Sequence, residues 1–443
     1  MARGSNRRDF MKLTAAASAG YFAAAGVAPK VSRAANETIN FASIGVDGKG
    51  ASDSNDAGRS GNMVAICDID DLRLNKAGGR FPEAKKYNDY RKMFDEMGKS
   101  IDAVTVSTPD HTHAVASAMA MHMGKACFTQ KPLTHSIWEA RRLGEIATET
   151  GVATQMGNQG TANSGLRHAG ALIQNGTLGT ISEVHVWTNR PVWPQGLDRP
   201  SETPDVPATI HWEEWIGPAP FRPYHPAYHP FKWRGWWDFG TGALGDMACH
   251  TLNMPFFGAD LKYPTSVVAE TSGHNKETYP KWSVITFEFP ATDKRGPVKL
   301  FWYDGGKVPP DALRAGAKLN PNASSGALVI GDKGTLHSPG DYCAEFEIIG
   351  MDKVPDAEFE KSPGHFEEWV RAIKGGPAAM SNFPNYAAPL TETILLGNLA
   401  VWADGKKVEW DAKNLKCTSS DEFDHIIHPP FRDGYTLDHT KKA

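Results

Sequence analysis

The sequence predicts two domains: an α/β domain with a doubly wound parallel sheet, followed by an α+β domain with antiparallel strands. Between residues 39 and 156, short apolar segments alternate with helical patterns, which is typical of a parallel sheet. After residue 181, the strand-like segments alternate apolar and polar residues, as half-exposed antiparallel strands do. A chain of 443 residues is long enough for both domains.

Residues 1–34 are predicted to be an export signal. The pair Arg7 and Arg8 is followed by Asp-Phe-Met-Lys and by an apolar, alanine-rich run over residues 13–28. This order resembles the twin-arginine signal, which exports proteins already folded, so we expect a periplasmic protein. An ordinary secretory signal with a chance Arg pair is the alternative. The run is too short and alanine-rich to predict stable membrane insertion.

Charge and cysteine content narrow the possible partners. Beyond residue 34 the chain carries 41 Lys and Arg against 50 Asp and Glu, a net charge of −9. This balance argues against nucleic acid and anionic membranes as partners. The five cysteines are widely spaced and form no CxxC or zinc pattern. We therefore expect neither a metal site nor a disulfide framework.

The predicted first domain, residues 35–160, begins with a strand over Ile39–Val46 that ends in a glycine-rich turn. Glycines at this point of a dinucleotide-binding fold let backbone N–H groups approach a pyrophosphate. The turn reads Gly-Val-Asp-Gly-Lys-Gly at 45–50, so Asp47 occupies the middle glycine position of the usual motif. Alone, this turn is a weak signal.

The second predicted strand, Met63–Cys67, ends at Asp68. An acidic residue about 20 residues beyond the glycine turn commonly holds the ribose hydroxyls of NAD. The carboxylate of Asp68 would also repel the 2′-phosphate of NADP, so we expect NAD, with NADP less favoured. The alternative is that Asp68 only forms a solvated strand end.

Strands and helices then alternate to the end of this domain. We expect a short strand at 83–87, a helix at 90–97, a strand at 101–107, a helix ending at 123, a strand at 126–129, a helix from the capping box of Ser136 and Glu139 to Gly151, and a strand at 152–156. Ligands of a doubly wound sheet bind at the carboxyl ends of its strands. The predicted cofactor-binding residues lie at these ends: Gly45, Val46, Gly48, Lys49, Asp68, Thr108, Pro109, Asp110, His113, Gln130, Lys131, Asn158 and Gln159.

The predicted second domain, residues 161–443, combines helices with half-exposed strands. Helices are expected at 163–175, 366–373 and 390–402, strands at 181–188, 267–271, 282–289 and 298–303, and a hairpin of 327–330 with 334–338. We expect the C-terminal helices to pack back on the first domain.

A Pro- and Trp-rich segment, Arg190–Phe239, interrupts this domain, and we call it the excursion. It is too long for a structureless loop in a compact domain unless it has a function. Seven of the 13 tryptophans lie within residues 187–237. They either pack in a core or form an aromatic wall for flat ligands such as sugars. Other residues of the excursion could line a substrate pocket: Tyr224, His225, Tyr228, His229, Arg234 and Asp238.

The most informative stretch is Trp236–Asn253, where a glycine-rich turn leads into an apolar helix. Asp246 and His250 are four residues apart and therefore lie on one face of that helix. A histidine beside a carboxylate can transfer protons. The alternative is an ordinary buried helical histidine. A metal site is not expected, since no third ligand has a suitable spacing.

Together these motifs resemble the glucose–fructose oxidoreductase / inositol dehydrogenase / MocA family. The family's Glu-Lys-Pro signature corresponds to residues 130–132, its Thr-Pro-Asn-x-x-His to residues 108–113, and its Asp-x-x-x-His to Asp246 and His250. The resemblance is closest to exported bacterial members that combine a twin-arginine signal with a Trp-Arg-Gly-Trp-Trp-Asp-Phe-Gly segment.

The resemblance implies a Rossmann-like first domain and an open, mostly antiparallel sheet in the second. The exposed face of that sheet commonly packs against another subunit, so a homo-oligomer is expected. Three positions depart from the family's pattern: Gln130 replaces a glutamate, Asp47 a glycine, and Asn253 an aspartate that many members carry.

The resemblance also implies roles for the candidate catalytic residues. Lys131 would lie beside the nicotinamide and hydrogen-bond the reacting hydroxyl. His250 would be the general acid or base, and Asp246 would orient the substrate or assist proton transfer. The predicted substrate-binding residues are Arg234, Trp236, Trp237, Asp246 and His250.

The leading predicted function is an NAD-dependent oxidoreductase that acts on a carbohydrate or cyclitol hydroxyl. The main alternative is a redox-neutral glycoside hydrolase or lyase, which holds NAD tightly, oxidises a sugar carbon transiently and cleaves the glycosidic bond by elimination. A non-catalytic binding protein is the third possibility, and the presence of Lys131, Asp246 and His250 argues against it.

Overall fold

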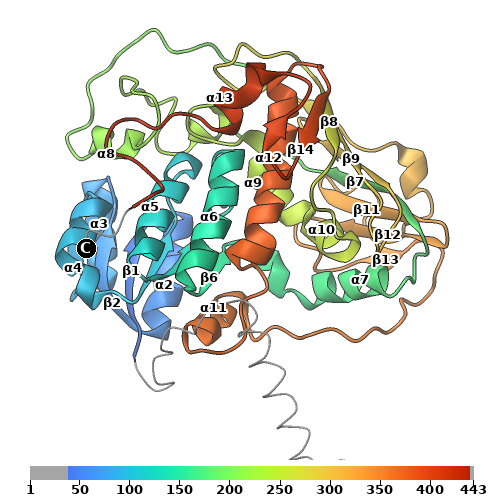
Figure 1. The fold of residues 1–443 in the computed structure, drawn as a ribbon, viewed down its shortest axis with the longest axis horizontal. Coiled ribbons are helices and arrows are strands. Elements are labelled where there is room, and N and C mark those ends of the chain that lie inside the picture. Colours follow the sequence, from blue (N-terminus) through green and yellow to red (C-terminus); the bar gives the residue numbers. More distant parts are fainter. Residues whose placement is uncertain (1–37, 440–443) are drawn as a thin grey trace, which may run out of the picture.

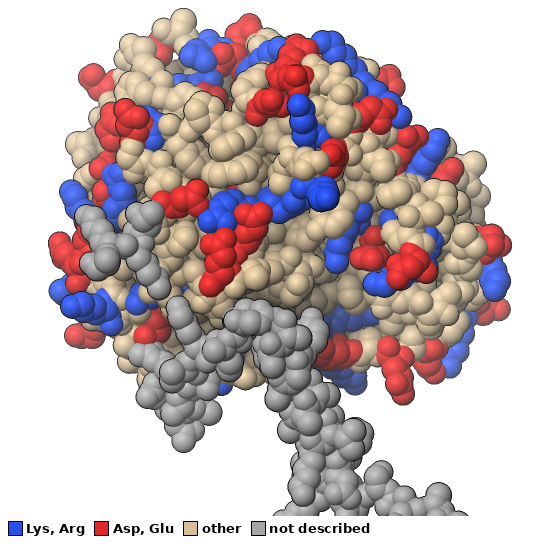
Figure 2. All heavy atoms as spheres, viewed as in Figure 1, with Lys and Arg blue, Asp and Glu red and all other residues tan. Residues whose placement is uncertain are grey.

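Two β-sheets with helices between them form the body of the protein (Figure 1). The computed structural model describes residues 38–439, so the export signal predicted for residues 1–34 lies outside the described residues. Within residues 38–439, no helix is long and apolar enough to cross a membrane. On the face drawn in Figure 2, Lys and Arg side chains are interspersed with Asp and Glu.

The first sheet has six parallel strands in the order β3-β2-β1-β4-β5-β6. Its strands are β1 (Asn40–Ile44), β2 (Asn62–Cys67), β3 (Lys85–Tyr87), β4 (Ala103–Val106), β5 (Ala126–Thr129) and β6 (Thr154–Met156). This order, in which the chain reverses direction beside β1, confirms the predicted doubly wound sheet. It also leaves the carboxyl ends of β1 and β4 open to a ligand.

Helices connect these strands: α2 (Lys49–Ser60), α3 (Asp71–Arg80), α4 (Tyr90–Met97), η1 (Gly98–Ser100), α5 (Asp110–His122) and α6 (Ile137–Thr150). The predicted capping box of α6 is present, since the Ser136 hydroxyl accepts from the Glu139 backbone N–H and the Glu139 carboxylate accepts from the Ser136 backbone N–H. Gly151 ends the helix in the left-handed conformation at φ 65°, which favours glycine.

The second sheet has nine strands in the order β13-β12-β11-β7-β10-β9-β8-β14-β15. The strands are β7 (Ile181–Trp187), β8 (Ser266–Thr271), β9 (Ser283–Phe289), β10 (Val298–Tyr303), β11 (Gly326–Gly331), β12 (Gly334–Pro339), β13 (Glu347–Ile348), β14 (Val408–Asp411) and β15 (Lys416–Cys417). Among the described strands of this second sheet, only the β7–β10 pair is parallel. The expected mostly antiparallel open sheet and the β11–β12 hairpin are confirmed.

The remaining helical segments belong to the second half of the chain: η2 (Gln159–Ala162), α7 (Ser164–Gln174), α8 (Trp212–Ile216), η3 (Lys232–Gly235), α9 (Gly242–Thr251), α10 (Asn253–Ala259), η4 (Asp311–Arg314), α11 (His365–Ile373), η5 (Phe383–Ala387), α12 (Ala388–Trp402), η6 (Asp421–Phe423) and α13 (Asp424–Ile427). Within the excursion, only α8 and η3 are helical. Tertiary packing of its aromatic rings therefore holds most of this segment.

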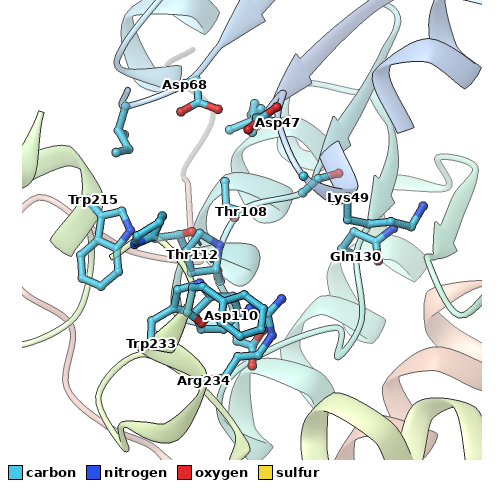
Figure 3. Close-up of a pocket in the computed structure, with 18 of the residues that line it drawn as sticks. Asp47, Lys49, Asp68, Thr108, Asp110, Thr112, Gln130, Trp215, Trp233 and Arg234 are labelled. Atoms are coloured by element: carbon cyan, nitrogen blue, oxygen red, sulfur yellow. Dashed lines mark hydrogen bonds between the residues drawn. The ribbon is translucent and has the colours of Figure 1, made fainter. Parts of the chain in front are cut away.

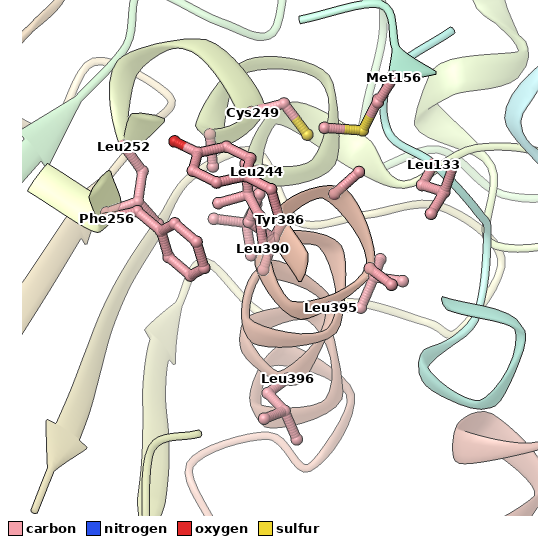
Figure 4. Packing of buried hydrophobic residues seen from close by; sticks show 14 of the residues in the cluster. Leu133, Met156, Leu244, Cys249, Leu252, Phe256, Tyr386, Leu390, Leu395 and Leu396 are labelled. Carbon is pink, nitrogen blue, oxygen red and sulfur yellow. The ribbon is translucent and has the colours of Figure 1, made fainter. Parts of the chain in front are cut away.

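Helix α12 joins the two sheets, because it packs on α6 of the first domain and on α9, β8 and β9 of the second. Figure 4 shows its Leu390 and Leu395 within an apolar cluster that also includes Leu133 from the first domain and Cys249 from α9. The cluster is continuous from one sheet to the other. Burial of this apolar surface fixes how the domains are placed relative to each other.

Two other C-terminal segments also contact the first domain. Helix α11 places Trp369 against Phe41 of β1 and Phe128 of β5. After α13, residues 428–439 run back across the first domain (Figure 1), and we call them the strap. Within the strap, His428 stacks on Trp138 of α6 with ring centroids 3.8 Å apart. Further strap contacts are Arg432 with Glu213, Leu437 with His122, and Asp438 with Arg142.

Candidate active site

A cleft of about 540 Å³ lies at the carboxyl ends of the first sheet. Asp47 and Asp68 lie toward one end, Trp233 and Arg234 toward the other, and Thr108 lies between them (Figure 3). The first end is built by the β1–α2 and β2–α3 turns. The second end is formed between that sheet, helix α9 and the excursion. The cleft therefore suits an elongated ligand that reaches from one domain to the other.

The glycine turn after β1 is shaped by close backbone contacts. Gly45 has φ 79°, and a Cβ there would lie 2.5 Å from the Ser107 carbonyl oxygen. A Cβ at Gly50 would lie 2.1 Å from the Gly45 carbonyl oxygen, so this residue lets α2 approach β1. Gly48, just before α2, has open space around its Cβ position. The free N-terminus of this helix and its open glycine fit a dinucleotide pyrophosphate.

Asp47, at the position where a glycine was expected, is paired within the first domain. The Lys76 ammonium lies 2.9 Å from its carboxylate, and this hydrogen bond lowers the pKa of Asp47. Arg73 lies 3.9 Å from the same carboxylate. These cations offset the negative charge that Asp47 brings to a phosphate-binding turn.

Asp68 closes the cleft beyond this turn. Its carboxylate accepts hydrogen bonds from the backbone N–H groups of Val46 and Asp70, both at 3.0 Å. Burial raises the pKa of Asp68. The carboxylate still lines the cleft, so it can accept further bonds from ribose hydroxyls.

A buried carboxylate that was not predicted, Asp53 of α2, explains the glutamine at position 130. The Gln130 side-chain amide and the Ser107 hydroxyl each donate to Asp53 at 2.8 Å, and the Lys49 ammonium lies 2.5 Å from it. A glutamate at position 130 would place a second carboxylate against Asp53, which is 1% exposed. Two buried carboxylates in contact repel each other, and an amide avoids that repulsion.

Lys131 and Asp246 meet across the two domains. The Lys131 ammonium donates to the Asp246 carboxylate at 2.8 Å and to the Asp246 backbone carbonyl at 2.7 Å. Burial raises the pKa of Asp246, but the charges of Lys131 and Arg234 outweigh burial and bring the pKa to about 2. Asp246 is therefore ionised at neutral pH.

His250 lies one helical turn beyond Asp246 and lines the same cleft. It is 3% exposed, and its Nδ1 has no hydrogen-bond partner among the described residues. Burial, together with the Lys131 charge, holds the pKa of His250 well below its ordinary value. The imidazole is thus neutral at pH 7 and can accept a proton. Among residues 38–439, no group of three or more His, Cys, Asp or Glu is placed to hold a metal ion.

Asp110 at the start of α5 links the two domains beneath the cleft. Its carboxylate accepts from the Thr241 backbone N–H at 3.1 Å and from the Thr241 hydroxyl at 2.6 Å. Burial raises the pKa of Asp110 to about 6. These bonds hold the start of α9, and with it Asp246, against the first domain.

Aromatic rings and arginines form the second end of the cleft. The Arg234 guanidinium carbon lies 4.2 Å from the centroid of the Trp233 ring and 5.0 Å from that of Phe231. Some tryptophans of the excursion pack in a core, and some also line the cleft, as the two expectations for them allowed. Trp212, Trp215, Trp233 and Trp236 share a buried cluster, and two of them, Trp215 and Trp233, also line the cleft.

Most of the predicted site residues line this cleft, but five do not: Val46, His113, Asn158, Trp236 and Trp237. His113 instead bridges the carbonyls of Thr108 and Pro132 at 2.8 Å each. Trp237 stacks on Tyr279 with ring centroids 3.7 Å apart.

Arg190, Tyr342 and Tyr435 also line the cleft, although none of them was predicted as a site residue. Arg190 carried a usable signal, because it follows the end of β7, whereas the positions of Tyr342 and Tyr435 depend on tertiary packing of loops. Trp193, Trp215 and Trp233 line the cleft as well, and they belong to the tryptophans for which an aromatic wall was one of two expectations.

Comparisons with known proteins agree with this architecture. Residues 39–158 match a profile described as "Oxidoreductase family, NAD-binding Rossmann fold", and residues 166–294 match "Oxidoreductase family, C-terminal alpha/beta domain". Together the two profiles cover more than half of the chain. The predicted NAD-binding Rossmann domain is thereby confirmed.

Individual relatives are distant. Inositol 2-dehydrogenase of Salmonella typhimurium is 28% identical over 125 residues, which are 28% of this chain and 37% of that protein. The chain spans about a third of the length of the curated relatives it matches.

Two solved structures share the fold over nearly their whole length. The WlbA dehydrogenase of Bordetella pertussis, in complex with NADH and UDP-GlcNAcA, has a TM-score of 0.60 at 16% identity, covering 85% of this chain and 99% of that one. An inositol dehydrogenase homologue of Azotobacter vinelandii, in complex with NADH and myo-inositol, has a TM-score of 0.57 at 16% identity, covering 85% and 98%.

Proposed function

Because this chain belongs to the Gfo/Idh/MocA oxidoreductase family, we propose that it is an NAD-dependent oxidoreductase acting on a hydroxyl of a carbohydrate or cyclitol. One observation carries the proposal: an ion-paired lysine and a neutral histidine share one cleft with a dinucleotide-binding turn. These are the groups that oxidation of an alcohol requires.

The residues of the first domain fit NAD. The backbone at Gly48 and the N-terminus of α2 would hold the pyrophosphate, and the Asp68 carboxylate would accept from the adenosine ribose. When bound, NAD supplies the hydride acceptor. The Thr108–Asp110 turn and Lys131 line the cleft between this region and α9.

Lys131 would hold the oxygen of the reacting hydroxyl. Two of its three N–H groups point to Asp246, at the carboxylate and at the backbone carbonyl. The third N–H is left for a substrate oxygen. The Lys131 ammonium would stabilise negative charge that develops on that oxygen as its proton leaves.

His250 would take the hydroxyl proton. Asp246 is ionised but engaged by Lys131, whereas the His250 imidazole is neutral and lines the cleft. In oxidation, the O–H proton would move to His250 as the C–H hydride leaves the same carbon. Reduction would run these steps in reverse.

A sugar and cyclitol panel tests this proposal. The purified protein is incubated with NAD and each candidate, and NADH is followed by absorbance while products are identified by mass spectrometry. Accumulation of NADH with a stoichiometric ketone supports it. If no candidate yields NADH or an altered product, the dehydrogenase assignment fails.

The contribution of the excursion and the strap to the cleft lining favours a second candidate function. The excursion contributes Trp193, Trp215 and Trp233 to its lining, and the strap contributes Tyr435. Retained NAD would suit redox-neutral cleavage of a glycoside, in which a transient oxidation promotes elimination and the hydride then returns. Glycoside cleavage without net NADH would identify this reaction in the same panel.

We also propose export through the twin-arginine route, supported by Arg7 and Arg8 and the apolar run that follows. Replacement of both arginines by lysine should leave the precursor in the cytoplasm, as fractionation would show. Unchanged periplasmic yield would instead indicate an ordinary secretory signal.

A homo-oligomer through the open sheet is proposed as well. The outer face of its central strands carries half-buried apolar side chains, among them Val268, Val284 and Phe301. Light scattering should show an oligomer that Val284→Glu dissociates. A monomeric wild-type protein would contradict this arrangement.

A further inference from the structure

Three cations surround the single carboxylate of Asp246 at the substrate end of the cleft. Lys131 makes the short contact at 2.8 Å. Arg234 Nε lies 3.4 Å from Asp246 Oδ1, and Arg190 Nε lies 3.9 Å from Oδ2. The two guanidinium groups are thus held near the carboxylate by long contacts, while Lys131 takes the strong one.

Neither arginine uses all of its N–H donors in hydrogen bonds within the protein. Arg234 also donates to the Phe231 carbonyl at 3.3 Å, and Arg190 donates to the Asn189 side chain. The side chains of Arg190 and Arg234 are 26% and 25% exposed, and both line the cleft. A guanidinium has five N–H donors, so each arginine keeps donors for a ligand.

The charge balance of this end of the cleft is positive. Among the described lining residues here, Lys131, Arg190 and Arg234 face only two carboxylates, Asp246 and Asp110. Asp110 is already held by two donors from Thr241. These lining groups therefore carry one net positive charge.

We propose that the substrate is a sugar acid, whose carboxylate is bound by Arg190 and Arg234 while its ring lies against the aromatic side chains of the excursion. This inference rests on the proposed function, because it names the substrate class of the same site. The planar guanidinium fork matches a carboxylate in two parallel hydrogen bonds. A single surplus charge suits a monoanionic carboxylate better than a dianionic phosphate ester.

The ring neighbours support a carbohydrate rather than a simple organic acid. Trp193, Phe231 and Trp233 surround the Arg234 guanidinium at 4.2 to 5.8 Å from their centroids, and all three line the cleft. Aromatic faces bind the C–H faces of a sugar ring. Arg234, which lies among these rings, could therefore bind a group attached to the sugar ring.

Calorimetry on the NAD-loaded protein tests the proposal. The probes are D-glucuronate and D-galacturonate, each compared with its neutral sugar, D-glucose or D-galactose, and with the corresponding sugar 6-phosphate. At least one uronate should bind tenfold or more tightly than its neutral partner, and added salt should weaken it. Arg190→Gln and Arg234→Gln should each lower the uronate-to-neutral affinity ratio about tenfold, toward one, which is the low end of the scale of one charged hydrogen bond.

Arg199→Gln is the matched control, because Arg199 also lies in the excursion and pairs with a carboxylate, Glu277, at 2.8 Å, but it does not line the cleft. Its affinity ratio should equal that of the wild type. Failure of both uronates to bind, a ratio near one, or a ratio that the arginine variants leave unchanged would overturn the inference. Tighter binding of a sugar phosphate would also overturn it.

The outcome for the proposed function is separate. Uronate binding without any hydride transfer would contradict the dehydrogenase and leave the acid-binding site standing. NADH formation from a neutral sugar, with no preference for the acid, would contradict the acid-binding site and leave the dehydrogenase standing.

Discussion

The Lys131 ammonium lies 2.8 Å from the Asp246 carboxylate, although the two residues are 115 positions apart and belong to different domains. The first domain contributes Lys131 after β5, and α9 of the second domain contributes Asp246. Their contact depends on how the domains pack, which α12 and the Asp110–Thr241 hydrogen bonds fix. The Lys131–Asp246 contact is therefore coupled to the position of α9.

Replacement of Lys131 by alanine should lower turnover by at least ~100-fold, the usual scale for loss of a proton-transfer or charge-stabilising group. The fold and NAD affinity should change little, since Lys131 lies beyond the glycine turn. Steady-state kinetics and NAD titration measure the two effects. Lys99→Ala, at an exposed position of the same domain, is the control. Turnover of the Lys131→Ala variant near that of the wild type would contradict a role for Lys131 in the reaction.

The pH profile should reveal the neutral state of His250. Burial and the Lys131 charge lower the pKa of His250 in the folded protein. An ordinary histidine becomes protonated below pH about 6.5, whereas this one stays neutral to lower pH. We expect kcat/KM for oxidation to show no loss from His250 as the pH falls from 8 to about 6.5, and an acid limb only below that.

The lowered pKa of His250 also determines how the stability of the protein changes with pH. A lowered folded pKa means that the stability contributed by neutral His250 is present above the unfolded value of about 6.5 and is lost as the pH falls below it. Imidazole NMR, assigned with a His250→Gln variant, reports the titration directly. A His250 midpoint at or above about 6.5 would contradict both expectations.

The contact between Asp53 and Gln130 should behave as a coupled pair. Gln130→Glu places a carboxylate where an amide now donates to Asp53 at 2.8 Å, so the free energy of unfolding should fall by about 1–3 kcal/mol. Asp53→Asn in the same protein should recover part of that loss, because an amide again faces a carboxylate. Urea unfolding of the two single variants and the double variant gives the coupling energy. Purely additive losses would show that the pair is not coupled.

The sequence predicted features that depend on local periodicity better than features that depend on contacts between distant segments. The parallel sheet and the Asp246–His250 helix face follow from local periodicity, and both were correct. The partners of Asp53 and the cleft position of Tyr435 depend on segments far apart in the sequence. Trp236 is a residue that the sequence wrongly predicted to contact a ligand. The tryptophan-rich segment around it suggested a ligand contact, but its side chain is 1% exposed and donates to the Ala227 carbonyl.

Cofactor choice should depend on Asp68. An equilibrium titration should show tighter binding of NAD than of NADP, because a 2′-phosphate would meet the Asp68 carboxylate. Arg73, the nearby cation that could attract that phosphate, already pairs with Asp70 at 3.3 Å. Asp68→Ala should narrow the preference, since it removes both the ribose acceptor and the repulsive charge. Tighter binding of NADP by the wild type would refute the assignment.

We predict that the protein retains bound NAD, because a periplasmic location would require retention and the strap would slow release. Exchange with free nucleotide is not available to a periplasmic enzyme, so NAD would have to stay bound and be reoxidised in place. The strap places Tyr435 in the cleft lining, with the Arg91 guanidinium carbon 4.9 Å from the centroid of its ring. Arg432 of the strap also pairs with Glu213 at 2.7 Å, which ties the strap to the excursion. We therefore expect release of NAD to require these two segments to separate.

We expect purified protein to keep NAD through extensive dialysis, as mass spectrometry would show. Tyr435→Ala, and a chain ending at His428, should release NAD about tenfold faster, equivalent to about 1.4 kcal/mol. Tyr263→Ala is the control, because Tyr263 also lies beneath an arginine, Arg141, but outside the cleft. Equal rates of NAD release from all of these proteins would show that the strap does not retain NAD. Rapid loss from the wild type, with activity only when NAD is supplied, would argue that the working enzyme draws on a free nucleotide pool, and thus against a periplasmic location.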